Sequence, residues 1–183
     1  GNTIVVGALE DGYDNRGTVY VFIQSANGEW IKSQQLYGFD SEPHDWFGCS
    51  VAINENFIFV GARGVDDIDS EETNGAVYIF NKVNGEWVHH QKIMPNDDYL
   101  YEFGRNLSLD GDNLLISANI GSVPPAIDSV YYYKQENGFW LMKQILMADD
   151  NNHTVNRPSF GKSISQSNNV AIIGSPSYVP SES

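Results

Sequence analysis

Residues 47–63 read FGCSVAINENFIFVGAR, and the same pattern returns twice further along the chain. It returns at residues 103–119 as FGRNLSLDGDNLLISAN and at residues 160–176 as FGKSISQSNNVAIIGSP. The Phe-Gly pairs that open these stretches lie 56 and 57 residues apart. A fixed period of this length is typical of a repeat architecture, in which each unit buries its apolar faces against its neighbours.

Two further apolar segments complete the repeat. After the first stretch come GAVYIF and NGEWVHHQKI, and after the second come DSVYYYK and NGFWLMKQIL. The N-terminal segments TIVVGAL, GTVYVF and NGEWIKSQQL match the tail of one more copy. We therefore divide a single repeat segment, residues 1–183, into a partial repeat 1–36, full repeats 47–93 and 103–146, and a partial repeat 160–183.

One full repeat is expected to form four β-strands, because its apolar runs are rich in β-branched and aromatic residues and are separated by turn residues. In the 47–93 copy the expected strands are Ser50–Ile53, Phe57–Val60, Ala76–Phe80 and Trp87–Ile93. Asn-Gly favours a two-residue type I′ hairpin turn, since both residues must adopt positive φ. We expect such turns at three places, Asn27-Gly28, Asn84-Gly85 and Asn137-Gly138. No segment shows a helical 3.6-residue pattern, so no helix is expected.

The last strand of each repeat carries a recurring set of residues. Trp87 is followed at offsets of four and six by Gln91 and Ile93, and the other copies have Trp, Gln and Leu at the same offsets, starting at Trp30 and Trp140. Side chains at even offsets in a strand point to the same side. The pattern predicts that the three side chains share one face of the strand.

Four antiparallel strands per repeat predict the blade of a β-propeller, and hence an all-β fold. The chain holds about three blades' worth of strands, which makes an incomplete ring because closed propellers have ~4–8 blades. Either the chain is part of a longer propeller, or strands from another copy complete it.

The motif itself resembles a known family. Phe47-Gly48 followed by Gly61-Ala62, and Phe160-Gly161 followed by Gly174-Ser175-Pro176, resemble the FG-GAP repeat of integrin α-subunit propellers. The likeness is closest to the calcium-free variant of secreted and surface proteins. The resemblance implies an extracellular or cell-surface protein. The sequence contains no nucleophile elbow, Gly-rich phosphate loop or His-Glu metal motif, so no enzymatic activity is expected. The second copy departs from the pattern, with Ser117-Ala118 in place of Gly-Ala.

The resemblance gives the signature residues a structural role. We expect the Phe of each pair to pack between blades and the Gly to permit close backbone approach. In the family, calcium binds a D-x-D-x-D-G loop between the first two strands, whereas the turns here are short and poor in carboxylates. No metal or other cofactor is therefore expected. The signature residues are Phe47, Gly48, Phe103, Gly104, Phe160, Gly161, Trp30, Trp87 and Trp140.

Charge limits the partners. The net charge is −14, from 24 acids against 10 Lys and Arg, which argues against nucleic acid or an anionic membrane as partner. No apolar run reaches the ~20 residues that span a bilayer. The single cysteine, Cys49, excludes a disulfide framework within the chain.

The acids gather in the longer connections. Of the 24, 17 lie in six loops that we expect on one rim of the propeller, where binding usually occurs. A protein or carbohydrate ligand would bind there, at the candidate residues Asp66, Asp67, Asp69, Glu71, Glu72, Asp97 and Asp98. The sequon Asn152-His153-Thr154 is a glycosylation candidate in a rim loop, whereas the sequon at Asn106 falls in an expected strand and is expected to stay unmodified.

Three functions are compatible with these features. The first is an extracellular binding or adhesion module that uses the acidic rim. The second is a structural protein whose exposed blades pair with further repeats or with copies of itself, into an oligomer or filament. The third is the propeller domain of a polysaccharide-acting enzyme.

Overall fold

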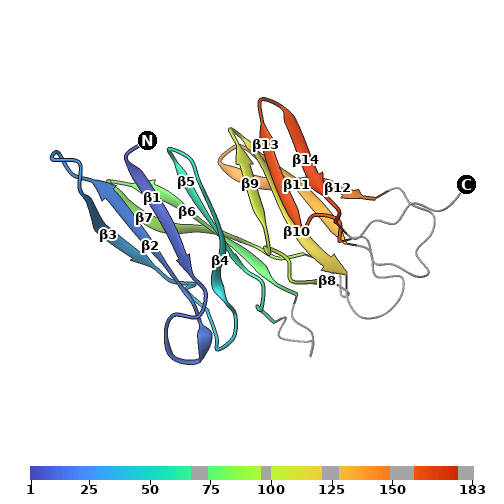
Figure 1. Ribbon diagram of the computed structural model, residues 1–183, viewed down its shortest axis with the longest axis horizontal. Helices are drawn as coiled ribbons and strands as arrows, with labels where there is room; N and C mark the ends of the chain where they lie inside the picture. The colour runs from blue at the N-terminus through green and yellow to red at the C-terminus, as the bar shows by residue number, and fades with distance from the viewer. Residues whose placement is uncertain (67–73, 96–99, 121–127, 149–158, 177–183) are drawn as a thin grey trace, which may run out of the picture.

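The structure, a computed structural model, describes residues 1–66, 74–95, 100–120, 128–148 and 159–176. These residues form fourteen β-strands and one 3-10 turn, η1 (Tyr13–Asn15), and they form no α-helix. The strands are grouped into four antiparallel sheets that lie side by side in chain order (Figure 1). The expected all-β fold of incomplete propeller blades is confirmed.

Each sheet corresponds to one copy of the repeat. The first sheet contains β1 (Thr3–Ala8), β2 (Thr18–Gln24) and β3 (Trp30–Leu36). The second contains β4 (Phe47–Ile53), β5 (Phe57–Ala62), β6 (Ala76–Val83) and β7 (Glu86–Ile93). The third contains β8 (Leu100–Tyr101), β9 (Leu107–Asp110), β10 (Asn113–Ile120), β11 (Ser129–Glu136) and β12 (Phe139–Met147). The fourth contains β13 (Ser163–Ser167) and β14 (Val170–Gly174).

The sheets pack face to face through two apolar layers. One layer joins the first and second sheets and includes Val19, Val21, Phe47 and Tyr78, all of them fully buried. The other joins the second and third sheets and is built around Phe103 and Trp140. Below, the front face of a sheet is the face toward the following sheet, and the back face is the face toward the preceding one. Residues 76–80 of β6 are buried on both faces, as their uninterrupted apolar sequence requires.

Glycine allows the backbones to meet at these interfaces. A Cβ atom on Gly61 would lie 2.0 Å from the carbonyl oxygen of Gly104 in the next sheet, which no side chain can tolerate. Gly104 itself has φ of +89°, a conformation that glycine adopts without strain. Phe47 and Phe103, which precede Gly48 and Gly104, are completely buried between sheets.

The Asn-Gly turns follow the prediction at two of three places. Asn84 and Asn137 both have positive φ, as do the glycines after them, and the flanking residues pair directly. At Asn27-Gly28 the prediction is wrong, because Asn27 is not in the left-handed region and the loop covers residues 25–29. The first copy has one more residue than the other copies between the valine of its third strand and the tryptophan of its last strand, at positions 19 and 30, and this converts the two-residue turn into a longer loop.

The prediction that the Trp, Gln and Leu or Ile side chains of the last strand share one face is also wrong. Ile79 pairs with Gln91 but Phe80 pairs with His89, so His90 is an extra residue that forms a β-bulge in β7. The extra residue reverses the alternation, so Trp87 packs on the back face while Gln91 points to the front. The same register shift occurs in β3 and β12.

The bulge produces a repeated contact between sheets, which we call the Gln–Trp clasp. The side chain of Gln34 accepts a hydrogen bond from the backbone N–H of Trp87 at 2.9 Å and donates one to its carbonyl at 2.7 Å. Gln91 does the same to Trp140, with both distances 3.0 Å. Each clasp therefore ties the outer strand of one sheet to the outer strand of the next.

Candidate binding rim

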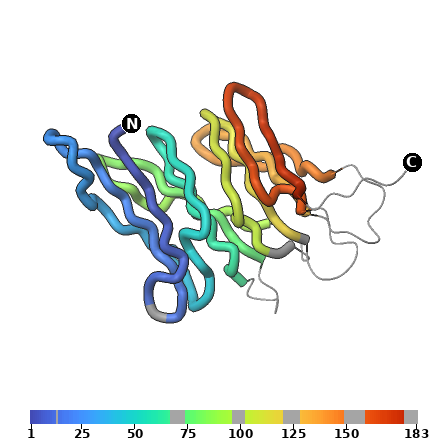
Figure 2. Tube along the Cα trace, in the orientation of Figure 1, coloured from blue at the N-terminus to red at the C-terminus, as the bar shows by residue number. Residues whose placement is uncertain are grey.

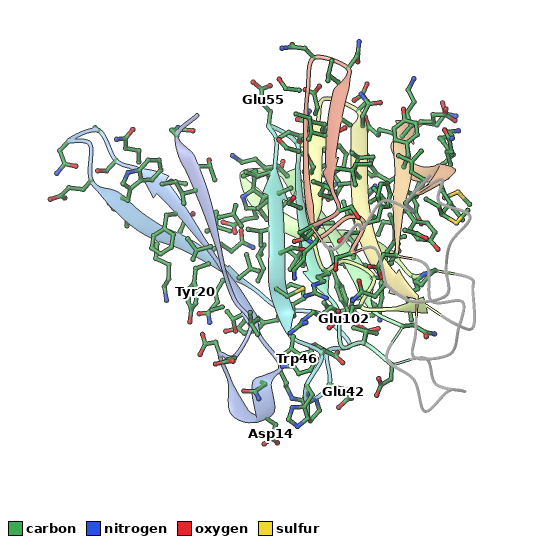
Figure 3. The ribbon with its side chains drawn as sticks, turned by 45° about the vertical axis from the view of Figure 1, so that its right-hand side comes forward. Asp14, Tyr20, Glu42, Trp46, Glu55 and Glu102 are labelled. Atoms are coloured by element: carbon green, nitrogen blue, oxygen red, sulfur yellow. The ribbon has the colours of Figure 1, made fainter. Side chains whose placement is uncertain are left out.

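Two long connections that the structure describes lie at one end of the stacked sheets. The loop that contains η1 and the loop between β3 and β4 lie side by side at this end (Figure 2), and the N–H of His44 donates to the carbonyl of Asp14 at 2.8 Å. Four labelled residues lie toward this end, namely Asp14, Glu42, Trp46 and Glu102 (Figure 3). Glu55 lies at the opposite end. We call this end of the molecule the rim.

The loop between β3 and β4 is fixed to the second sheet. Asp40 accepts hydrogen bonds from Tyr78 and Lys92, both at 2.7 Å. Phe39 packs edge-on against His89 with 4.5 Å between ring centroids. The loop therefore has one defined position, although Phe39 remains 66% exposed.

Two carboxyl groups of this loop have opposite pKa shifts. Partial burial raises the pKa of Asp40, but the hydrogen bonds from Lys92 and Tyr78 outweigh this effect, and the pKa lies below its ordinary value. Asp45 is almost fully buried, and burial raises its pKa above the ordinary value. Its carboxylate accepts a hydrogen bond from the N–H of Glu42 at 2.7 Å, so it is turned into the loop instead of facing solvent.

Glu102 forms the centre of a charged network at the boundary of the second and third sheets. Its carboxylate binds Arg63 and Arg105, each at 2.6 Å, and accepts a hydrogen bond from Asn119 at 2.6 Å. The guanidinium of Arg63 also lies over the ring of Trp46, 4.8 Å from its centroid, which is a cation–π contact. Glu102 is therefore neutralised within the protein.

A backbone feature recurs before the Phe-Gly pairs. Trp46 has φ of +53° and Glu102 has φ of +54°, a region that non-glycine residues rarely occupy. The carbonyl of each accepts a hydrogen bond from the residue three positions later, Cys49 or Arg105, at 3.1 Å. The turn aims the side chains of Trp46 and Glu102 along the rim. The position before Phe-Gly varies in type between copies, so the repeat pattern gave no signal for these residues.

The acids that remain free are fewer than the sequence implies. Glu10, Asp14 and Asp66 are exposed, and none of them forms an ion pair within the part of the chain that the structure describes. Glu42 pairs with Arg16 at 3.5 Å across solvent-exposed side chains, an interaction of little strength. These four carboxylates form the exposed acidic part of the rim, and Glu42 is the one of them with an ion-pair partner among the described residues.

Most of the binding residues singled out from the sequence lie outside the part of the chain that the structure describes. Asp66 is exposed at the rim, whereas six other candidate binding residues and the sequon residue lie outside the described residues: Asp67, Asp69, Glu71, Glu72, Asp97, Asp98 and Asn152. Among the residues that are described, no group of three or more His, Cys, Asp or Glu side chains could hold a metal ion.

The signature aromatic residues differ in burial along the chain. Trp87 and Trp140 are 5% and 1% exposed, but Trp30 is 41% exposed. Phe160 is half-buried, unlike Phe47 and Phe103.

The second sequon residue, Asn106, donates from its side-chain amide to Ser117 Oγ and to the carbonyls of Gly161 and Lys162. Its amide nitrogen is therefore engaged in the fold.

Stacked antiparallel sheets, long loops at one end and close glycine contacts define the chain as a set of β-propeller blades. Residues 30–80 match the family model of the FG-GAP repeat. The chain carries an FG-GAP repeat, as the Phe-Gly pattern predicted. This repeat is a non-catalytic type, typical of propeller-type binding modules, and it occurs in extracellular and surface proteins.

No curated protein matches the chain significantly. Within the described residues, no helix has the length and apolar character needed to cross a membrane.

Proposed function

We propose that this chain is an extracellular protein-binding and adhesion module, and that its ligand binds at the acidic rim. The observation that carries the proposal is the fixed loop between β3 and β4, which presents Glu42 toward the same end as Asp14, next to the loop that contains η1. The repeat type supports a binding role, because FG-GAP repeats are typical of propeller-type binding modules.

The electrostatics of the rim favour a ligand with a basic surface. Arg63 and Arg105 are both occupied by Glu102, so the described cations of that boundary do not offset the free acids. Exposed carboxylates on one side of a protein attract a cationic partner and increase its association rate, in a manner that falls with ionic strength. The net charge of −14 acts in the same direction.

The aromatic residues of the same loop supply apolar contact area. Tyr37 and Phe39 are 57% and 66% exposed, and Phe39 is held by His89 and Tyr78. Rigid, exposed aromatic side chains next to charged groups are typical of binding hot spots. A ligand that combines basic and apolar side chains fits this surface best.

The proposal can be tested with two matched variants. The rim variant carries Asp14→Asn, Glu42→Gln and Asp66→Asn, and the control variant carries Glu55→Gln, Glu86→Gln and Asp112→Asn. All six residues are exposed, and each variant removes three charges. Adhesion of each protein to surfaces coated with an extracellular-matrix protein extract, and separately with poly-L-lysine, is measured at physiological salt.

The expected result is that the rim variant loses most of its adhesion to the matrix extract while the control variant keeps it. Equal loss in both variants would show that only net charge matters, and would refute a rim site. Equal retention in both would refute it as well. Poly-L-lysine reports the non-specific charge effect and should respond similarly to the two variants.

A further inference from the structure

The dipeptide Asn-Gly occurs at three exposed places that differ in structure more than in local sequence. Asn27-Gly28-Glu29 and Asn84-Gly85-Glu86 are the same tripeptide, and Asn137-Gly138 is the third place. An asparagine before glycine is prone to spontaneous loss of its side-chain ammonia, because glycine has no Cβ to keep its backbone nitrogen away from the asparagine side chain. Since residues 27 and 84 share one tripeptide, a large difference in this reaction between them has to come from the fold.

The reaction depends on the backbone conformation of the asparagine. The backbone nitrogen of the glycine attacks Cγ of the asparagine and closes a five-membered ring, so Cβ and this nitrogen must lie nearly eclipsed about the Cα–C bond. In a type I′ turn the ψ angle of the first central residue, roughly +30°, places the two atoms nearly opposite each other. Ring closure in such a turn therefore needs a large rotation of the backbone.

The second and third sheets hold their Asn-Gly pairs in this unreactive geometry. Asn84 and Asn137 have φ of +53° and +52°, and the glycines after them have positive φ as well. The residues that flank each turn pair directly across it, so the rotation would open the strand ladder. The carbonyl of Gly138 also accepts a hydrogen bond from Nε2 of His90 at 2.8 Å, which ties that turn to the second sheet.

The loop of the first sheet leaves Asn27 without this constraint. The last strand pair before the loop is Gln24 with Trp30, and residues 25–29 lie between them. The N–H of Gly28 donates to a carbonyl of the same loop at 3.0 Å. Rotation about the Cα–C bond of Asn27 disturbs contacts inside the loop but leaves the pair of Gln24 and Trp30 in place.

Two side chains of the loop contact the amide that reacts. The hydroxyl of Ser25 donates to Oδ1 of Asn27, the oxygen that becomes negatively charged when a nucleophile adds to Cγ, so it stabilises the developing charge. Nδ2 of Asn27 donates to Oε2 of Glu29 at 3.0 Å, which places a carboxylate beside the leaving nitrogen to carry the proton that it takes up. In the part of the chain that the structure describes, the side chains of Asn84 and Asn137 have no comparable contacts.

We propose that Asn27 is a site of spontaneous deamidation, and that the fold protects Asn84 and Asn137 from the same reaction. The nitrogen of Gly28 forms a bond to Cγ of Asn27, the bond from Cγ to Nδ2 breaks, and Nδ2 leaves as ammonia with the proton of the Gly28 N–H. Water then adds to one of the two carbonyls of the cyclic imide. Opening of the bond from nitrogen to Cγ gives aspartate, and opening of the bond from nitrogen to the backbone carbonyl carbon gives isoaspartate.

The product changes the loop between β2 and β3. Each conversion replaces an amide with a carboxylate next to Glu29, and like charges repel, so the contact between the two side chains is lost. Isoaspartate also adds a methylene group to the backbone of the loop. The loop lies at the end of the sheets opposite the rim (Figure 1), so deamidation and ligand binding at the rim are tested independently.

The wild-type chain contains its own control. The folded protein is incubated at mildly alkaline pH in water enriched in heavy oxygen, and peptide mapping by mass spectrometry follows each asparagine over time. Asn27 should convert about tenfold faster than Asn84, which corresponds to ~1.4 kcal/mol of activation free energy, and Asn137 should convert no faster than Asn84. In concentrated urea the rates at Asn27 and Asn84 should be similar, because the tripeptide is the same and the turn is lost.

Two variants test the cause of the difference, with circular dichroism to check that each is folded. Deletion of Ala26 gives the first copy the spacing of the other copies, so it should form a two-residue turn and lower the rate at Asn27 to that at Asn84. Ser25→Ala should slow conversion of Asn27 about threefold to tenfold, less than the loss of an oxyanion-hole donor in an enzyme, because the loop is exposed. Ser33→Ala, at an exposed position of the same sheet, should leave the rate unchanged.

The comparison within the folded wild-type chain decides the proposal without any variant. Equal rates at Asn27 and Asn84, or a faster rate at Asn84, would overturn it. An undiminished rate at Asn27 in a folded deletion variant would overturn the role of the turn. A product that contains heavy oxygen but no isoaspartate would overturn the cyclic imide, because direct hydrolysis of the side chain gives aspartate alone.

Discussion

The Gln–Trp clasp makes a quantitative prediction for the variant Gln91→Ala. The side chain of Gln91 both accepts from and donates to the backbone of Trp140 at 3.0 Å, in a partly buried position between the second and third sheets. A net hydrogen bond contributes roughly 1 kcal/mol, and a buried polar group left without a partner costs about 1–3 kcal/mol. Because the substitution removes two bonds and strands two backbone groups, we expect it to lower the free energy of unfolding by about 2–4 kcal/mol.

Urea denaturation followed by tryptophan fluorescence is a suitable assay, since Trp140 lies at the interface that the substitution loosens. With a urea m-value of about 2 kcal/mol per molar, typical of a small protein, the transition midpoint should fall by roughly 1–2 M. Gln24→Ala is the matched control, because the exposed Gln24 side chain makes one hydrogen bond, to the carbonyl of Gly28 within its own loop. Gln91→Glu should be intermediate, since a carboxylate can accept from the N–H of Trp140 but cannot donate to its carbonyl. A loss of less than about 0.5 kcal/mol for Gln91→Ala, within the range of ordinary surface substitutions, would refute the clasp as a stabilising contact.

Three further predictions concern other parts of the fold. Asp40→Asn should destabilise the protein at pH 7, and the difference from the wild type should vanish as pH falls through the lowered folded-state pKa of Asp40. Asp45→Asn should instead stabilise the protein at pH 7, and this advantage should be lost as pH falls through the raised folded-state pKa of Asp45. Thermal melts at several pH values test both signs. Gly61→Ala should destabilise by about 1–3 kcal/mol or more, because the new methyl group meets the carbonyl of Gly104, while Ala62→Gly next to it should cost less; equal denaturation midpoints for the two variants would contradict the close approach. In a eukaryotic secretory host Asn152 should carry glycan and Asn106 should not, since the Asn106 amide is bonded within the fold; mass spectrometry that finds glycan at Asn106 would contradict this.

Local chemistry explains which turns could be read from the sequence. Asn84-Gly85 and Asn137-Gly138 form type I′ turns because two residues with easy access to positive φ suffice to set the geometry. The turn at Asn27-Gly28 differs by one residue of spacing, which the dipeptide alone does not reveal. The four strands of the 47–93 copy were likewise predicted within a few residues of β4, β5, β6 and β7, since apolar runs bounded by turn residues are a local signal.

The direction of side chains depended on pairing between strands. The even spacing of Trp87, Gln91 and Ile93 predicted one common face, but the bulge at His90 separates the tryptophan from the other two. A bulge is set by the register of the partner strand, and the sequence of residues 87–93 alone does not predict it. The Gln–Trp clasp, which follows from the bulge, was therefore also beyond the reach of sequence reasoning.

The sequence by itself determined that this chain is an all-β repeat protein of the FG-GAP type, because strand periodicity, turn residues and repeat spacing are written in short stretches of chain. The tertiary structure decided which charges are free. Asp40, Asp45 and Glu102 count as rim acids in the sequence, yet their carboxylates are hydrogen-bonded or paired by Tyr78, Lys92, Arg63 and Arg105 and by a backbone N–H. Charge is a property of composition, whereas its neutralisation depends on partners that folding brings together. Tyr78, Lys92 and Arg63 lie 38 to 52 residues away in the chain, so only three-dimensional packing specifies them.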